Sequence, residues 1–330
     1  MHSGRTKQGR ERRTVSVLVP NYNHAAFLPA ALDALFGQTR TFDEVLVLDD
    51  ASTDSSLEVI AAYSARHAAM RVLRSDRNRG VSYSVNRLVH EARSDYIVCA
   101  GADDTLKSNF VERSMAVLER YPEAGICFSE MVVREIDGRE VNYARTMPQS
   151  FGIADLPEYL APADLARQFG EHYLWMISNT IVARRDAVME VGGFDPEQEW
   201  HSDWFTYYVT ALRHGACAIP EGLAVIRANP GGYSDRGMKD KRRQYKVLRA
   251  IARGLRSSPA DQLRPVFKRY PALLSVFGSD LIFALLRSPR DWDLLARYAI
   301  WFARKTHQIH GASWYALVAR HLLKRALGKV

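Results

Sequence analysis

The sequence has few cysteines and no long apolar run. Its 330 residues include three cysteines, Cys99, Cys127 and Cys217. They are widely spaced and odd in number, so we expect buried free thiols in a reducing compartment, and neither disulfides nor a cysteine metal site. No stretch reaches the ~20 apolar residues that a membrane-spanning helix needs. The closest run, 272–286, is interrupted by Asp280.

The amino-terminal residues 1–13 are polar and basic. They lack the apolar segment of a secretory signal, so we expect a short disordered tail. Four motifs of other enzyme classes are also missing: GxGxxG, GxxxxGK[ST], HExxH and GxSxG. Their absence argues against dinucleotide-dependent enzymes of the Rossmann type, P-loop NTPases, zincin proteases and α/β-hydrolases.

Charge is distributed unevenly along the chain. The formal net charge is +8, with 45 basic and 37 acidic side chains. Residues 238–330 hold 20 of the basic and 5 of the acidic ones, a net of +15, which leaves −7 for residues 1–237. A basic carboxyl-terminal part of this kind is typical of a surface that meets anionic lipid, an anionic substrate or nucleic acid.

Apolar periodicity predicts strands that alternate with helices as far as residue 128. Alternation of this kind indicates βαβ units and a mostly parallel sheet flanked by helices, an α/β fold. Residues 139–172 show no regular pattern, and from about Met238 the pattern is helical to the end. The predicted strands are 14–20, 44–48, 70–73, 96–100 and 125–128, and the predicted helices are 25–36, 55–67, 82–92 and 109–120.

Polar residues follow three of these strands directly: the segment 21–23, the pair 49–50 and the pair 103–104. Ligands of parallel α/β sheets bind beyond the carboxyl ends of the strands, so we expect one shared site. Helix capping could explain one acid in each pair, but not two adjacent acids after a strand. The second pair suits a divalent cation, because Mg²⁺ and Mn²⁺ prefer carboxylate oxygens and neutralise their repulsion.

A third acidic position, Asp203, lies in the aromatic segment Glu199–Tyr207. Aromatic neighbours desolvate a carboxylate and raise its pKa, which suits a general base. The alternative is an acid that begins a helix beside core aromatics.

Six segments in this order together resemble family-2 glycosyltransferases over about residues 14–237. They are VPNYN (19–23), VLDDASTD (47–54), NRG (78–80), DYIVCAGADD (95–104), GGFD (192–195) and HSDWF (201–205). The resemblance implies a GT-A fold in residues 14–237, with a Rossmann-like sheet. Residues 238–330 then form a helical basic extension.

The resemblance also implies the chemistry. It implies a nucleotide-diphosphate sugar donor, in the first place a UDP-sugar, a divalent Mg²⁺ or Mn²⁺, and inversion at the anomeric carbon. In this reading Asp104 binds the metal with Asp103, which lies nearer the ribose, and Asp203 deprotonates the acceptor hydroxyl. The residues that it assigns to the nucleotide sugar are Pro20, Asn21, Tyr22, Asn23, Asp49, Asp50, Asn78, Gly80, Asp103 and Arg227.

The chain departs from the family pattern at Gly101, where many members have Asp, at Val85 in place of Arg, and at Ser202 in place of Glu. It also lacks the QxxRW motif of processive members, which favours transfer of a single sugar to a glycan or lipid-linked acceptor. Two alternatives remain: a nucleotidyltransferase, disfavoured because no glycine-rich phosphate loop follows the first strand, and a nucleotide-sugar-binding protein without turnover.

For location, we expect a cytoplasmic enzyme at the inner face of a membrane. The basic helices after Met238 would meet anionic lipid, with Trp292, Trp301 and Trp314 at headgroup depth. The alternative is that these helices only cover the core, because the same apolar stripe serves either purpose. Nucleic acid is the disfavoured partner of this region.

Overall fold

The computed structural model describes residues 12–142, 153–171 and 176–310, with side chains as far as Lys305 in the last range. The predicted tail before Arg12 and the helix expected around Trp314 lie outside these residues. The strands are β1 (Val15–Asn21), β2 (Glu44–Asp49), β3 (Met70–Arg74), β4 (Tyr96–Cys99), β5 (Thr105–Leu106), β6 (Ile126–Arg134), β7 (Glu140–Asn142), β8 (Tyr159–Leu160), β9 (Ile181–Arg184) and β10 (Ala216–Arg227). The helices are α1 (Leu28–Phe36), α2 (Ser56–Ser64), α3 (Val81–Glu91), α4 (Phe110–Arg120), α5 (Pro162–Glu171), α6 (Arg185–Glu190), α7 (Ser202–His214), α8 (Tyr233–Lys239), α9 (Lys241–Gly254), α10 (Arg264–Arg269), α11 (Gly278–Leu286) and α12 (Trp292–His310).

One sheet organises the molecule, in the order β3-β2-β1-β4-β9-β6-β10-β5. The first four strands of this order are parallel, and β9 joins them antiparallel to β4 and β6. Strands β1, β2 and β4 are buried almost throughout, as expected of parallel strands that are covered on both faces. The predicted α/β fold, a central sheet flanked by helices, is confirmed. The sheet is mixed: it is parallel from β3 to β4 and between β6 and β10, and its other pairings are antiparallel.

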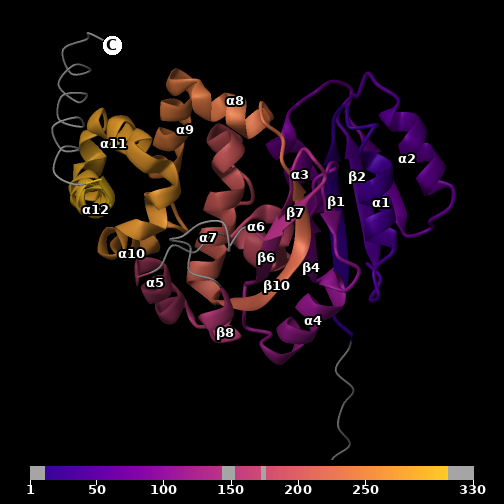
Figure 1. The fold of residues 1–330 in the computed structure, drawn as a ribbon, viewed down its shortest axis with the longest axis horizontal. Helices are drawn as coiled ribbons and strands as arrows, with labels where there is room; N and C mark the ends of the chain where they lie inside the picture. The colour runs from indigo at the N-terminus through magenta and orange to yellow at the C-terminus, as the bar shows by residue number, and fades with distance from the viewer. Residues whose placement is uncertain (1–11, 143–152, 172–175, 311–330) are drawn as a thin grey trace, which may run out of the picture.

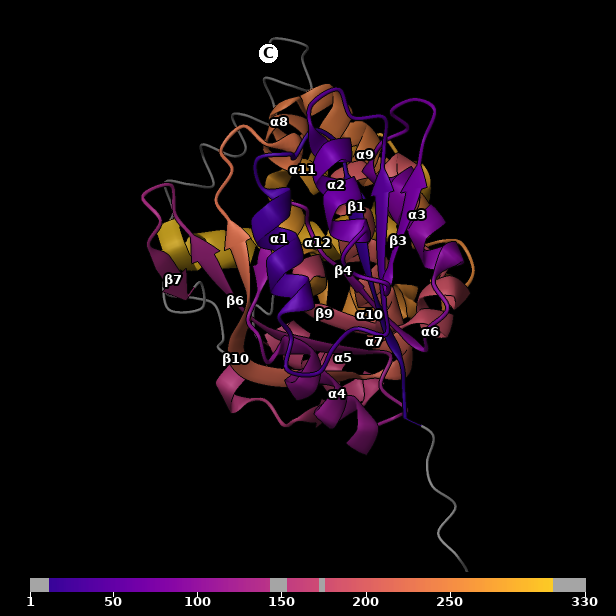
Figure 2. The same ribbon diagram turned by 90° about the vertical axis from the view of Figure 1, so that its right-hand side faces the viewer.

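Each face of the sheet has its own layer of helices (Figures 1 and 2). One apolar cluster joins the sheet to α1, α2 and α4. The other joins it to α3, α5, α7 and the carboxyl-terminal helices. The carboxyl ends of β1, β2 and β4, where the sequence predicts the site, therefore lie between two packed layers.

Three of the differences between the structure and the predicted elements concern α1, β6 and α5. Helix α1 begins at Leu28 and not at Ala25, because Pro29 occupies its first turn and the N–H groups of Phe27 and Leu28 both donate to the His24 carbonyl. Strand β6 continues to Arg134, where it pairs with β10 and β7. Helix α5 forms in the stretch with no regular sequence pattern and buries Leu165 and Phe169.

The helices after Met238 share the core of the rest of the chain. Leu248 of α9 and Phe267 of α10 belong to the same buried cluster as Trp204 of α7. Phe277 packs edge-to-face on Trp204, with ring centroids 4.6 Å apart. Trp301 also packs against this cluster and is only partly exposed, so less of its indole is open to solvent than that of Trp292.

In the described part of the chain, no single helix is long and apolar enough to cross a membrane. Two segments, Asp261–Arg269 and Pro271–Leu286, meet that test only when taken together, and the chain bends by 93° between them.

Because the core is shared, we expect Phe277→Ala to destabilise the whole chain. Removing this buried ring should lower the free energy of unfolding by about 3–5 kcal/mol. Urea unfolding followed by tryptophan fluorescence and by far-UV circular dichroism should show one coincident transition at a lower midpoint. Ile136→Ala, at a side chain that is 81% exposed, is the matched control and should unfold like the wild type. Two separate transitions would contradict a shared core.

Candidate active site

The loops that follow β1 and β2 are joined to each other by side-chain hydrogen bonds. Asn21, the last residue of β1, donates from Nδ2 to Oδ2 of Asp49 at 2.8 Å, and Asp49 Oδ1 accepts from the Ser52 N–H at 3.0 Å. Asn23 has a left-handed backbone (φ 58°), and its Oδ1 accepts from the Thr53 N–H at 2.7 Å. Both oxygens of Asp49 are thus used within the protein, and this carboxylate shapes the loop.

Asp50 is held differently. It is buried, and its Oδ2 accepts from the backbone N–H groups of Arg79 and Gly80, each at 2.8 Å. The Asn78 side chain completes this turn by accepting from the Gly80 N–H at 3.0 Å. Asp50 Oδ1 and Asn21 Oδ1 are buried without a hydrogen-bond partner among the described residues. Two unpartnered acceptors at the end of neighbouring strands indicate a ligand that brings N–H or O–H donors.

Asp103 and Asp104 follow β4, on the turn into β5. Asp104 Oδ1 accepts from the Arg227 N–H at 2.8 Å, and Oδ2 accepts from the side-chain amide of Asn179. Burial, together with the charge of Asp103, raises the pKa of Asp104 to about 7. Asn179 was not predicted from the sequence, since a polar residue before a short strand carries no distinctive pattern.

Gly101 marks where these groups converge. A Cβ atom at this position would lie 2.7 Å from Asp104 Oδ2, 3.2 Å from Asp103 Oδ1 and 3.3 Å from Asn179 Nδ2. Both carboxylates and the amide therefore face the space above Gly101. A side chain at position 101 would displace these groups. The glycine of this chain, where many family members have Asp, therefore allows the two carboxylates and the amide to lie close together.

The pair Asp103–Asp104 fits a divalent cation. Mg²⁺ and Mn²⁺ are commonly held by one or two carboxylates, with phosphate oxygens and water completing the shell. Burial, and after it the charge of Asp103, raises the pKa of Asp104, and a bound cation would favour the ionised carboxylate. No cluster of three His, Cys, Asp or Glu side chains suited to a metal occurs among residues 12–142, 153–171 and 176–305. A complete shell would thus need oxygens from a ligand.

The other residues predicted at this edge surround the two acidic clusters. The Arg227 guanidinium stacks over the Phe27 ring, 3.8 Å from its centroid, while its N–H is bound to Asp104. Tyr22 is 40% exposed, which leaves its ring accessible to a ligand. Pro20 lines the neighbouring pocket.

That pocket, of about 210 Å³, contains Asp203 at the start of α7. Pro20, Gly101 and Asn179 line it together with Asp203, so it connects the strand-end site to this carboxylate. Burial raises the pKa of Asp203 to about 6, opposed by a hydrogen bond from the Trp204 N–H at 2.7 Å. A carboxyl group with this pKa, in an accessible pocket, can take up a proton from a bound hydroxyl near neutral pH.

The segment before Asp203 is held in a strained form. Glu199 has a left-handed backbone (φ 43°), uncommon for a residue with a side chain. Its carboxylate pairs with Arg243 and accepts from the Tyr233 hydroxyl at 3.3 Å. Trp200 is fixed by a hydrogen bond from its Nε1 to Gln244 and by contact with Gly237, where a Cβ would lie 2.2 Å from the indole. Helices α8 and α9 thereby set the mouth of the pocket.

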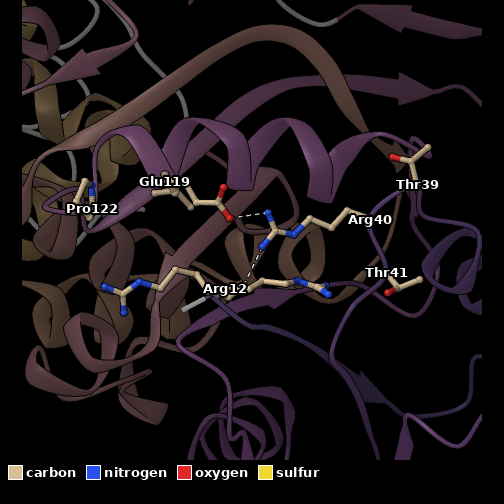
Figure 3. A pocket seen from close by; sticks show the side chains of 8 residues that line it. Arg12, Thr39, Arg40, Thr41, Glu119 and Pro122 are labelled. Atoms are coloured by element: carbon tan, nitrogen blue, oxygen red, sulfur yellow. Dashed lines mark hydrogen bonds and ion pairs between the residues drawn. The ribbon is translucent and has the colours of Figure 1, made fainter. Parts of the chain in front are cut away.

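A larger hollow, of about 660 Å³, lies between the start of β1 and the end of α4 (Figure 3). Arg40 points across it, pairs with Glu119 at 2.7 Å and donates to the Arg13 carbonyl at 2.8 Å. It lies where the parallel strands begin, so it is separate from the site at their carboxyl ends. None of the residues predicted for the site lines it.

Because the carboxyl group of Asp203 is buried, we expect its contribution to the free energy of unfolding to depend on pH. Its pKa of about 6 in the folded protein exceeds the ~3.9 of an unfolded chain, so the folded state retains a proton that the unfolded state loses. This residue's contribution to stability therefore falls as pH rises from about 4 to about 6.

Asp203→Asn removes this titration and can still accept from the Trp204 N–H. We compare the free energy of unfolding of the variant with that of the wild type. As pH rises from about 4.5 to about 7.5, this difference should shift in favour of the variant by about 1–3 kcal/mol, a range that allows for the partial exposure of the site. Urea unfolding of both proteins at the two pH values measures the gain. A pH-independent difference would show that Asp203 titrates normally. The control is Asp137→Asn, at an exposed turn.

Two solved structures show the same fold. One is TarS 1-349 of S. aureus in complex with UDP-GlcNAc, with a TM-score of 0.63, 18% identity, and coverage of 86% of this chain and 78% of that chain. The other is mannosyltransferase PcManGT from Pyrobaculum calidifontis in complex with GDP-Man and Mn²⁺. Its TM-score is 0.57 at 19% identity, with 95% of this chain and 81% of that chain covered.

Relatives by sequence include an uncharacterized protein of Mycobacterium tuberculosis (H37Rv), 28% identical over 241 residues. The uncharacterized glycosyltransferase YibD of Escherichia coli K12 is 27% identical over 177 residues. These matches cover 71% and 53% of this chain. The chain spans less than two thirds of the length of these relatives, 64% of the first and 50% of the second.

Residues 16–190 match the family described as Glycosyl transferase family 2. This range contains β2, β4 and nearly all of β1, together with Asp50, Asp103 and Asp104, whereas Asp203 and Arg227 lie beyond it. The chain belongs to glycosyltransferase family 2.

Proposed function

We propose that this glycosyltransferase moves one sugar from a nucleotide-diphosphate sugar, in the first place a UDP-sugar, to a hydroxyl of a glycan or lipid-linked acceptor, with inversion. The observation that carries the proposal is the pocket in which Asp203 faces Pro20, Gly101 and Asn179. It supports a donor whose nucleotide lies along the strand ends and whose sugar reaches Asp203. The bound UDP-GlcNAc and GDP-Man of the two solved relatives agree with such a donor.

In the proposed mechanism, Asp50 Oδ1 accepts an N–H from the edge of the base, while the backbone of Arg79 and Gly80 holds the other oxygen in place. Asp49 and Asn23 keep the two loops joined and bind the nucleotide only through the shape that they impose. Tyr22 offers its exposed ring to the base. The donor is thus oriented mostly by groups that the protein has already fixed.

Asp203 then acts as the general base. It takes the proton of the acceptor hydroxyl as that oxygen attacks the anomeric carbon, and the bond from this carbon to the diphosphate breaks. Attack from the face opposite the leaving group inverts the anomeric configuration. Asp103 and Asp104 would hold a divalent cation that stabilises the charge on the leaving diphosphate. Arg227, stacked on Phe27 beside Asp104, adds a positive charge on the same side.

Asp104→Asn tests the metal assignment. We expect the donor affinity in the presence of Mn²⁺ to fall at least ~10-fold in the variant. Substitutions of residues that only support a metal ligand already cost that much. A thermal-shift screen of UDP- and GDP-sugars with and without Mn²⁺ measures this, because ligand binding raises the melting temperature. The unliganded variant should stay folded, because the Asn oxygen can still accept from the Arg227 N–H and the Asn179 amide can turn its oxygen toward the new NH2 group. Unchanged Mn²⁺ dependence would overturn the assignment.

Asp203→Asn tests the base. Donor binding in the thermal-shift assay should survive, whereas transfer should fall by ~10²- to 10⁴-fold. In the wild type, kcat/KM should rise about tenfold per pH unit below about 6 and level off above it, because only the ionised carboxylate accepts a proton. Asp137→Asn is the control. Near-normal transfer by Asp203→Asn, with the same pH profile, would assign the role of base to another group.

A further inference from the structure

One end of the molecule exposes large apolar side chains among cations. It is formed by the end of α11 and the outer side of α12, on the side of the molecule away from α2 (Figure 1). Leu286 is 49% exposed, Trp292 56% and Ile300 53%. Trp292 and Leu286 lie side by side, with the indole N–H 3.4 Å from the Leu286 carbonyl. We call the exposed side chains from Leu286 to Lys305 the α12 edge.

The packing of α12 fixes which side chains lie on this edge. Leu294 and Tyr298 are buried, and the Tyr298 hydroxyl donates to the Gly278 carbonyl at 3.0 Å. The opposite face then follows helical spacing: Trp292, Ala296 and Ile300 are four residues apart, with Arg297 and Arg304 beside them. The helix thus has an apolar core side and a second, mixed apolar and basic side that faces water.

The cations of the α12 edge have no acidic partner in the part of the chain that the structure describes. Residues 241–305 contain four acids, and Asp280, Asp291 and Asp293 are each paired with other cations: Lys241, Arg256, Arg264 and Lys268. The fourth, Asp261, lies before α10. Among the described residues, no ion pair forms with Arg287, Arg290, Arg297, Arg304 or Lys305, and all five are exposed. The edge therefore combines a net positive charge with apolar side chains.

We propose that the α12 edge docks on the surface of an anionic lipid bilayer. The geometry matches what an interfacial helix needs: one apolar stripe with a tryptophan for the headgroup region, and arginines beside it for the lipid phosphates. The core side of the same helix is already filled, so docking requires no unfolding. The enzyme would then lie on the membrane as a peripheral protein, at a leaflet rich in acidic lipid.

Co-sedimentation of the full chain with vesicles tests the proposal. The protein should bind vesicles of equal parts phosphatidylcholine and phosphatidylglycerol and not vesicles of phosphatidylcholine alone. Binding should weaken as salt rises from about 0.1 M to about 1 M, because the screening length falls from about 10 Å to about 3 Å. The triple variant Arg287→Glu, Arg290→Glu, Arg297→Glu should bind the anionic vesicles at least ~100-fold more weakly, since each basic side chain contributes about fivefold.

The matched control reverses three exposed cations elsewhere that form no ion pair among the described residues: Arg74→Glu, Arg77→Glu and Arg93→Glu. It makes the same change in net charge, so it separates a specific edge from general attraction. Trp292→Ser with Ile300→Ser should also weaken binding, whereas Ile136→Ser, at another exposed side chain, should not. All variants should keep the wild-type unfolding midpoint. Failure of the wild type to bind anionic vesicles, or equal loss in the two triple variants, would overturn the proposal.

Discussion

Parallel pairing of β1 with β2 and β4 is the constraint on which the site depends. It brings the carboxyl ends of three strands to one edge, and the register places Asn21 opposite Asp49. The hydrogen bond between these two side chains then joins the following loops. Asp50 and the pair Asp103–Asp104 follow strands that end at this edge, and Asn21 Oδ1 and Asp50 Oδ1 are buried there without a partner among the described residues. A ligand or an ordered water would satisfy these acceptors.

Desolvation raises the pKa of two carboxyl groups, Asp104 at the strand ends and Asp203 at the start of α7. Asp104 is raised by burial and by the charge of Asp103, so a cation would relieve it. Asp203 is raised by burial alone, with no neighbouring acid among the principal causes. A cation at the first position leaves the second available to exchange a proton. The same physical effect, desolvation of a carboxylate, can thus provide both a metal site and a base, according to whether a second carboxylate is adjacent.

The parts of the fold that could be predicted are those in which local pattern and tertiary role coincide. The buried strands β1, β2 and β4 have continuous apolar runs, and the acids after them are visible as pairs. The role of Asn179 could not be predicted, because it depends on β9 inserting antiparallel between β4 and β6, which no local pattern of residues 176–184 indicates. The crowding at Gly101 likewise appears only when Asp103, Asp104 and Asn179 are brought together.

The carboxyl-terminal helices show why a charge pattern alone left two interpretations open. An amphipathic helix can cover a core or meet a membrane, and the sequence treats these as alternatives because it has one apolar stripe for either purpose. In α12 the apolar side chains lie on two different faces: Leu294 and Tyr298 pack inward, while Trp292 and Ile300 remain exposed. Trp301 belongs to the inward side, although it has the same residue type as Trp292. Burial of one face of α12 therefore does not argue against a partner for the other face. The exposed cations on the outer face favour an anionic partner there over packing against more of the protein's own apolar core.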